Sequence, residues 1–224
     1  MSLKFKALGL GFLAALAMST VSVMSASATS TGHFTSDSPN GKTTFLGSDA
    51  GSHQTEFTLH GFSGGFDCDL FSYNGTDSGN TLTSITVTPD YTKCFTTGES
   101  PDSSVVTLNG CSYTFTPGGS GTVHVDCPAG KAIEIHHPNC VITMRPQTAQ
   151  GITYTNVIDF NGKHFLTLDA NTTQFNTEFH GGVCIFTGTN HTATLHGSTT
   201  IRGFRDEGAG QPLGPQVNIT HTAE

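Results

Sequence analysis

The stretch CSYTFTPGGSGTVHVDCPAGKAIEIHHPNCVITM, residues 111–144, alternates apolar and polar side chains and contains three cysteines and three histidines. Alternation of this kind is typical of β-strands that bury one face. A hairpin loop centred on Gly119 places the apolar residues before and after it opposite one another, on the same face of the sheet. The facing pairs are Cys111 with Cys127, Tyr113 with Val125, and Phe115 with Val123.

Two further turns extend this hairpin into a predicted four-stranded meander. The tripeptide Pro128-Ala129-Gly130 matches a three-residue hairpin loop, because Pro favours a type I turn and Gly accepts the left-handed position that follows. Pro138-Asn139 predicts the next turn. The facing pairs are then Val125 with Ile133, Val123 with Ile135, Ile135 with Ile142, and Ile133 with Met144. Because three separately chosen turns give one apolar face, we expect this face to line the core.

The opposite face of the predicted meander is polar. Cross-strand pairing places His124 beside Glu134, with Thr114 and Thr143 completing the row. We interpret this face as a candidate binding surface, formed by Thr114, His124, Glu134, His136 and Thr143. The cysteines point to the other side, so the cysteines and histidines of this stretch cannot bind one zinc ion together.

A metal site on the polar face alone is the alternative that this arrangement raises. Imidazole and carboxylate groups on adjacent strands suit zinc, and His124, Glu134 and His136 are of these types. The stretch lacks a fixed ligand spacing such as HExxH, so a solvated face with a charge-compatible pair is the simpler interpretation. The sequence therefore predicts no metal ion and no cofactor.

All six cysteines follow residue 28, and an even number in an exported chain favours disulfide bonds. The predicted hairpin pairs Cys111 with Cys127, provided that they form the closer, non-hydrogen-bonded kind of cross-strand pair that disulfide geometry requires. Proximity along the chain gives the remaining two pairs, Cys68 with Cys94 and Cys140 with Cys184.

Residues 1–28 have the composition of a secretory signal peptide. Lys4 and Lys6 precede an apolar run over residues 7–18, and the triplet Ala26-Ser27-Ala28 supplies a cleavage site. The apolar run is shorter than the roughly 20 residues that a membrane-spanning helix needs. We therefore expect a secreted, extracellular protein of residues 29–224, with no membrane span after cleavage.

After the leader, short alternating runs separated by Gly, Pro, Asn and Asp recur along the chain, and no window has a helical period. The predicted fold class is all-β, an antiparallel β-sandwich or a barrel-like meander crosslinked by disulfides. Residues 29–224 form one domain in this interpretation, and a boundary near Pro128 is the alternative that divides them into two β modules.

The charge balance limits the partners. Without residues 1–28 the chain has 7 basic and 17 acidic residues, a formal net charge of −10. Such a surface repels phosphate backbones and anionic membranes, so nucleic acid is an unsuitable partner. The partner expected is an extracellular ligand or surface component, and the oligomeric state stays open.

One motif resembles that of hydrolases. The run GFSGG at residues 61–65 matches G-x-S-x-G, which in hydrolases places the serine between a strand and a helix. Here a run without helical period follows, so turn glycines are the simpler interpretation. No catalytic residue is therefore assigned.

The runs VTPDYTKCF (87–95), VTLNGCSYTFT (106–116), VHVDCPAGKAIEI (123–135), CVITM (140–144) and GITYTN (151–156) together resemble a group of secreted actinobacterial proteins of unknown function. That group has a similar order of a Pro-x-Tyr-x-x-Cys element, a Gly-Cys-x-Tyr-Thr-Phe strand and a Cys-Pro-Ala-Gly turn. The likeness covers roughly residues 55–200 and implies export and an all-β fold. It brings no catalytic residues.

The sequence thus predicts a passive extracellular binding, surface or structural protein, in which loops and a Thr-rich polar sheet face recognise a ligand. The alternative is an extracellular hydrolase whose site is assembled from residues far apart in the sequence. A deep pocket with convergent acid, base or histidine groups would favour the hydrolase, and a flat Thr-lined face would favour binding.

Overall fold

The computed structural model describes residues 32–49, 55–59, 65–96, 103–138, 140–181 and 188–223. These residues form β-strands and no helix, which confirms the predicted all-β class. In chain order the strands are β1 (His33–Ser36), β2 (Lys42–Asp49), β3 (Thr55–Leu59), β4 (Gly65–Ser78), β5 (Thr81–Leu82), β6 (Ile85–Thr96), β7 (Val105–Thr107), β8 (Ser112–Thr116), β9 (Gly121–Asp126), β10 (Ile133–His137), β11 (Cys140–Met144), β12 (Gln147–Ile158), β13 (His164–His180), β14 (Gly188–Arg205), β15 (Gln216–Val217) and β16 (Ile219–Thr222).

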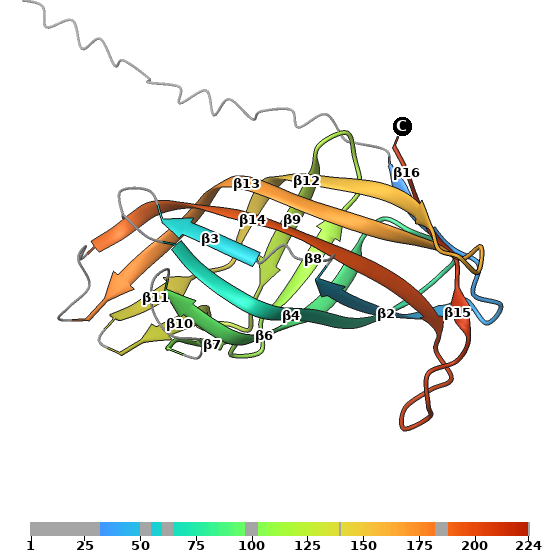
Figure 1. Cartoon of the computed structure of the whole chain (residues 1–224), viewed down its shortest axis with the longest axis horizontal. Helices are drawn as coiled ribbons and strands as arrows, with labels where there is room; N and C mark the ends of the chain where they lie inside the picture. Colours follow the sequence, from blue (N-terminus) through green and yellow to red (C-terminus); the bar gives the residue numbers. More distant parts are fainter. Residues whose placement is uncertain are drawn as a thin grey trace, which may run out of the picture.

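Eight strand positions form an antiparallel barrel, shown in Figure 1. Four positions are shared by two strands each, namely β2 and β3, β7 and β8, β9 and β10, and β11 and β12. The other four positions are single strands, namely β4, β6, β13 and β14. Each position pairs with the next in chain order, and β14 pairs with both β13 and β2, which closes the ring. The remaining strands are additions, because β15 extends β14 and β1, β5 and β16 form a separate three-stranded sheet.

Half of the strand positions consist of two strands placed end to end. The unbroken strands β4, β6, β13 and β14 are 12 to 18 residues long and run through both halves of the barrel. Short segments at residues 108–111, 127–132 and 145–146 separate β7 from β8, β9 from β10, and β11 from β12. The chain keeps its direction across each break, because β8 is antiparallel to β9 and β7 is antiparallel to β10.

The structure corrects the hairpin predicted at Pro128-Ala129-Gly130. A turn does form, since the Lys131 N–H donates to Pro128 O at 2.9 Å and Gly130 has a φ of 74°. However, β9 pairs with β8 and β12, and β10 pairs with β11 and β7. Neither residue pair predicted across this turn is formed, that is, Val125 with Ile133 and Val123 with Ile135. A hairpin after β9 and a continuation of the same strand position would both bury the same alternate residues of β9 and β10. The alternation of apolar and polar residues could therefore not distinguish the two arrangements.

The other two predicted hairpins form with the predicted register. The observed pairs are Tyr113 with Val125 and Phe115 with Val123 between β8 and β9, and Ile133 with Met144 and Ile135 with Ile142 between β10 and β11. All eight side chains are buried in one core. The predicted apolar face of residues 111–144 is therefore confirmed, although its strands are arranged differently.

Two of the predicted disulfides are confirmed. Cys68 pairs with Cys94 between β4 and β6, and Cys111 pairs with Cys127 where β8 begins and β9 ends. Their Cα atoms are 4.0 and 4.1 Å apart, as expected for the closer kind of cross-strand pair. Cys140 is also disulfide-bonded. Cys184 lies outside the described residues, so the Cys140–Cys184 pair stays a prediction.

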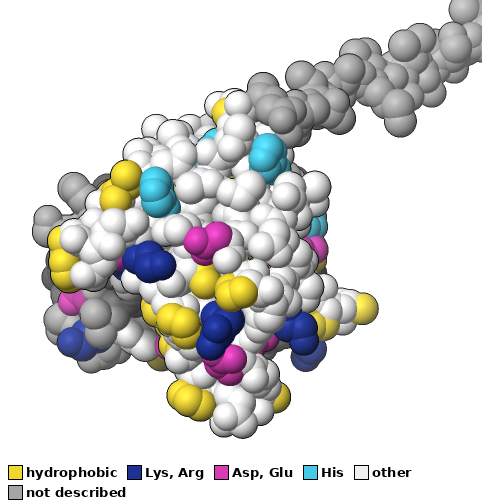
Figure 2. All heavy atoms as spheres, turned by 90° about the vertical axis from the view of Figure 1, so that its right-hand side faces the viewer, with side chains coloured by type: hydrophobic (Ala, Val, Ile, Leu, Met, Phe, Trp, Pro, Cys, Tyr) yellow, Lys and Arg dark blue, Asp and Glu magenta, His cyan; other side chains and the backbone are white. Residues whose placement is uncertain are grey.

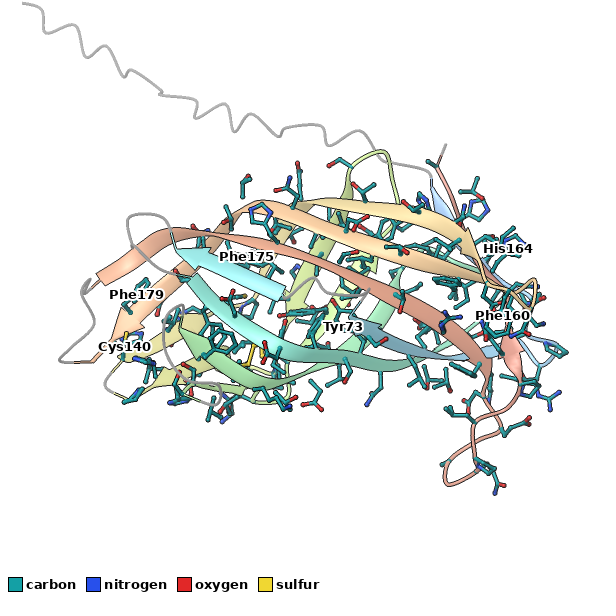
Figure 3. All side chains as sticks on the ribbon, viewed as in Figure 1. Tyr73, Cys140, Phe160, His164, Phe175 and Phe179 are labelled. Carbon is teal, nitrogen blue, oxygen red and sulfur yellow. A yellow bond between two sulfur atoms is a disulfide. The ribbon has the colours of Figure 1, made fainter. Side chains whose placement is uncertain are left out.

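Large side chains fill the barrel interior, as Figure 3 shows. Tyr91 and Tyr113 meet there with their hydroxyl oxygens 2.7 Å apart, and burial raises the pKa of Tyr113 to about 12. A cavity lined by both rings has a volume of about 30 Å³, which is space for roughly one water molecule. The described side chains around this cavity therefore pack closely.

The sheet of β1, β5 and β16 lies against one end of the barrel (Figure 1). Phe34 of β1 is fully buried, and its ring centroid lies 5.0 Å from that of Tyr154 and 5.6 Å from that of His221. The side-chain amide of Asn156 donates to His221 O and accepts from His221 N, both at 2.8 Å, and so attaches β16 to β12. The imidazole Nε2 of His221 is buried and has no hydrogen-bond partner among the described residues.

We expect His221 to weaken the fold on acidification. Burial, and next the nearby His33, lower the pKa of His221. The unfolded chain therefore binds a proton more readily than the folded chain, so stability is full above about pH 6.5, the ordinary histidine pKa, and is lost as the pH falls toward the lower folded pKa. Urea unfolding between about pH 7.5 and 5 should show a smaller loss for His221→Phe than for the unchanged protein. Equal losses in both would contradict this role.

Candidate functional site

The five predicted binding residues belong to the outer face of the barrel in two separate groups, although Thr143 is only 7% exposed. Thr114 and His124 face each other on β8 and β9. Glu134, His136 and Thr143 lie on β10 and β11, where Glu134 faces Thr143. The predicted neighbour pair of His124 and Glu134 is therefore wrong, because β9 and β10 occupy one strand position and do not pair.

The second group lines a groove with a volume of about 570 Å³, which we call the β10–β11 groove. Its lining comes from the turns that follow β7 and β9, from β10 and β11 themselves, and from the end of β13. Its ionisable and hydroxyl side chains belong to Lys131, Glu134, His136, Thr143, Arg145 and His180. Figure 1 places β10 and β11 at the end of the barrel away from β16.

Two cross-strand rows organise the groove. Strand β11 lies between β10 and β13, so that Thr143 is flanked by Glu134 and Glu178. In the next row, Val141 is flanked by His136 and His180. These side chains share the outer face because they alternate with the buried residues Ile135, Ile142 and Phe179.

Imidazole–carboxylate contacts join the two rows, and an ion pair with Arg145 adds to them. Arg145 binds Glu178 through two parallel hydrogen bonds, Nε to Oε1 at 2.7 Å and Nη2 to Oε2 at 2.9 Å. This pair raises the pKa of the Arg145 guanidinium and lowers that of the Glu178 carboxyl. The imidazole Nε2 atoms of His136 and His180 lie 3.1 and 3.4 Å from carboxylate oxygens of Glu134 and Glu178.

Gln147 supports the strand that carries Glu178. Its side-chain amide donates to Asn176 O at 2.9 Å and accepts from Asn176 N at 2.7 Å. These two bonds replace backbone pairing at the point where β13 changes its partner from β12 to β11. The side chain of Gln147 thereby connects β12 to β13 at the point where β13 changes its partner.

The first group belongs to a chain of hydrogen bonds across β8, β9 and β12. His124 Nδ1 lies 2.6 Å from Thr148 Oγ1, and His124 Nε2 lies 3.1 Å from Asp126 Oδ1. Thr114 Oγ1 donates to Asp126 Oδ2 at 2.8 Å, and it lies 3.1 Å from Thr86 Oγ1. This order of hydroxyl, imidazole and carboxylate is that of a nucleophile, a base and its orienting acid.

The structure does not assemble the metal site weighed for His124, Glu134 and His136, because His124 lies in the other group. Across the ranges that the structure describes, no three histidine, cysteine or acidic side chains are placed to hold a metal ion. The described residues also include no helix that is long and apolar enough to cross a membrane.

An exposed aromatic ring lies at the other end of the barrel, on the hairpin between β12 and β13. Phe160 is 97% exposed, and Figure 3 places it opposite the end that holds Cys140. Asp159 Oδ1 accepts from the N–H groups of Lys163 at 3.0 Å and Asn161 at 2.8 Å, and these bonds, with Arg202, lower the pKa of Asp159. Figure 2 shows hydrophobic side chains among charged ones on this end.

The sequence interpretation missed the contribution of β13 to the groove. Neither His180 nor Glu178 belongs to the binding surface that the sequence predicts. A signal was present, because Glu134-Ile135-His136 and Glu178-Phe179-His180 both place an acid and a histidine two residues apart. In a strand this spacing puts both side chains on one face.

Comparisons of the chain with protein-family models, with curated proteins and with solved structures gave no match. The function is therefore inferred from the groove and the hydrogen-bonded chain themselves.

Proposed function

We propose that the protein is secreted and binds an extracellular ligand or surface component in the β10–β11 groove. The composition of residues 1–28 supports export, and disulfides such as Cys68–Cys94 and Cys111–Cys127 are typical of oxidising compartments. The observation that carries the proposal is the groove, where ionisable and polar side chains from three strands converge on a hollow of about 570 Å³. Sites for small molecules have volumes of about 300–1,000 Å³.

Hydrolysis is the second candidate, because of the order Thr148–His124–Asp126. The side chains of His124 and Asp126 are 41% and 49% exposed, so water competes for any charge that develops in a reaction there. In the groove, hydrogen bonding to Arg145 lowers the pKa of Glu178, the reverse of what a general acid needs. Binding is the function that these groups support better.

A paired experiment tests the two candidates on the same sample. We expect soluble saccharides, presented one at a time to ¹⁵N-labelled protein, to include at least one that shifts the amide resonances of Val141 and Thr143. Hydrolysis of p-nitrophenyl acetate should be the same for the unchanged protein and for Thr148→Val. Shifts absent from the groove with every saccharide would contradict binding there, and ester hydrolysis that Thr148→Val abolishes would favour the hydrolase.

A further inference from the structure

The groove differs in charge from the rest of the protein. Residues 29–224 have 17 acidic and 7 basic residues. The groove lining, by contrast, has two cations and two imidazoles against one carboxylate: Lys131, Arg145, His136 and His180 against Glu134. Nitrogen donors of these kinds form their strongest hydrogen bonds with oxyanions. The composition of the groove therefore favours an anionic ligand on a protein whose remaining surface disfavours one.

Arg145 is held in a position to donate. Its side chain is 58% exposed, and Glu178 engages Nε and Nη2. A guanidinium has five N–H groups in a fixed plane, and those of Nη1 are not engaged by Glu178. The bidentate contact fixes the plane of the guanidinium, which reduces the entropy lost when a ligand binds.

Histidines make the charge of the groove depend on pH. The charged groups that face them are Lys131 from the turn after β9, Glu134 from β10, Arg145 from the end of β11 and Glu178 from β13, and these cancel in formal charge. Histidine side chains gain charge between about pH 8 and pH 5, and carboxyl groups ionise near pH 4. With both imidazoles protonated, the described groups of the groove carry two positive charges in excess.

We propose, resting on the function proposed above, that the β10–β11 groove binds a short acidic saccharide through its carboxylate groups and binds it more tightly as the pH falls from about 8 to about 5. A volume of about 570 Å³ exceeds what a small inorganic anion fills. Asn109 and Thr143 line the same groove. The Asn109 amide nitrogen donates to Ala132 O at 2.9 Å, and its side-chain oxygen can accept from a sugar hydroxyl. A short ligand is favoured because charges beyond about 8 Å are screened, whereas a long polyanion meets the net charge of −10.

Trigalacturonic acid is the probe, with maltotriose as the neutral control and inorganic sulfate as the small-anion control. Titrations of ¹⁵N-labelled protein at about pH 7.5 and about pH 5.5, at constant salt, use the amides of Val141 and Thr143 as reporters. Two added charges near a carboxylate, each worth about 1 kcal/mol in water at 4 Å and less when screened, correspond to about a tenfold lower Kd at the lower pH.

Variants separate the pH effect from the binding itself. His136→Gln combined with His180→Gln should remove most of the tenfold ratio between the two pH values. Lys131→Gln should raise Kd at both pH values, which provides a second test should the double variant fold poorly. His164→Gln, on β13 near the barrel end that carries Phe160 (Figure 3), is the matched control and should leave both values unchanged.

Each contrary result contradicts one part of the proposal. Equal affinity for maltotriose overturns the acidic ligand and leaves the proposed binding function standing. An affinity for sulfate as high as that for trigalacturonic acid overturns the proposal that the ligand is a saccharide. A pH ratio kept by the double histidine variant overturns the role of the imidazoles. No shift with trigalacturonic acid at either pH overturns the whole inference, and the binding function falls only if all other saccharides also leave the groove unshifted.

Discussion

Replacing the Cys111–Cys127 pair by two alanines is expected to lower the free energy of unfolding by about 3 kcal/mol, and replacing the Cys68–Cys94 pair by a similar amount. The bridges join residues 16 and 26 positions apart, and removing each one restores the freedom of that loop in the unfolded chain. Loss of both, about 6 kcal/mol, is comparable with the net stability of many domains, about 5–15 kcal/mol. Guanidinium unfolding of the single-pair and double-pair variants measures these differences.

The stability of the Cys111 and Cys127 variant also tests how the barrel is held together at the breaks between its strands. This bridge joins the start of β8 to the end of β9, at the two breaks between β7 and β8 and between β9 and β10. Alanine pairs leave no free thiol from either bridge, so a change reflects the lost crosslink. A decrease below about 1 kcal/mol for the Cys111 and Cys127 variant would mean that the strand pairing alone holds the barrel at these breaks.

Gly151→Ala should destabilise the barrel by about 4 kcal/mol, the sum of backbone strain and a steric clash. Gly151 has a φ of 99°, which residues with a Cβ rarely adopt, and an added Cβ would lie 2.3 Å from Asn171 O. It is the extra residue of a β-bulge in β12, between Gln150 and Ile152. Bulges increase the local bend of a strand, and this one lies where β12 pairs with both β9 and β13.

Gly130 is a control that separates the cost of backbone strain from the cost of the steric clash. Gly130 also has a positive φ, 74°, and an added Cβ there would have no atom within 4 Å. Gly130→Ala should therefore cost only the strain, about 1 kcal/mol. Equal losses for the two variants, measured by urea unfolding, would show that contact with Asn171 contributes nothing.

Local pairing was predictable from the sequence, because it depends on residues close in the chain. The loop around Gly119 and the turn at Pro138-Asn139 fix the register of two hairpins, and with it the Cys111–Cys127 bridge. Sandwich and barrel both bury alternate residues, so alternation could not choose between them. The choice depends on the pairing of β14 with β2, which joins segments about 150 residues apart.

The candidate site was predictable in part for the same reason. Glu134, His136 and Thr143 belong to one local hairpin, and its alternation correctly put them on the outer face. His180 joins them only because β11 pairs with β13, which is a non-local pairing. The predicted contact of His124 with Glu134 was wrong since it assumed that the chain reverses after β9.

The two ends of the described chain pair with each other, as β1 with β16, and they lie at the opposite end of the barrel from β10 and β11 (Figure 1). A tether attached to either terminus would therefore anchor the protein by the same pole. If the protein is immobilised on a sensor surface through a tag added at its C-terminus, every molecule would present the groove to the flowing solution, so binding measured in this format would need no correction for blocked orientations.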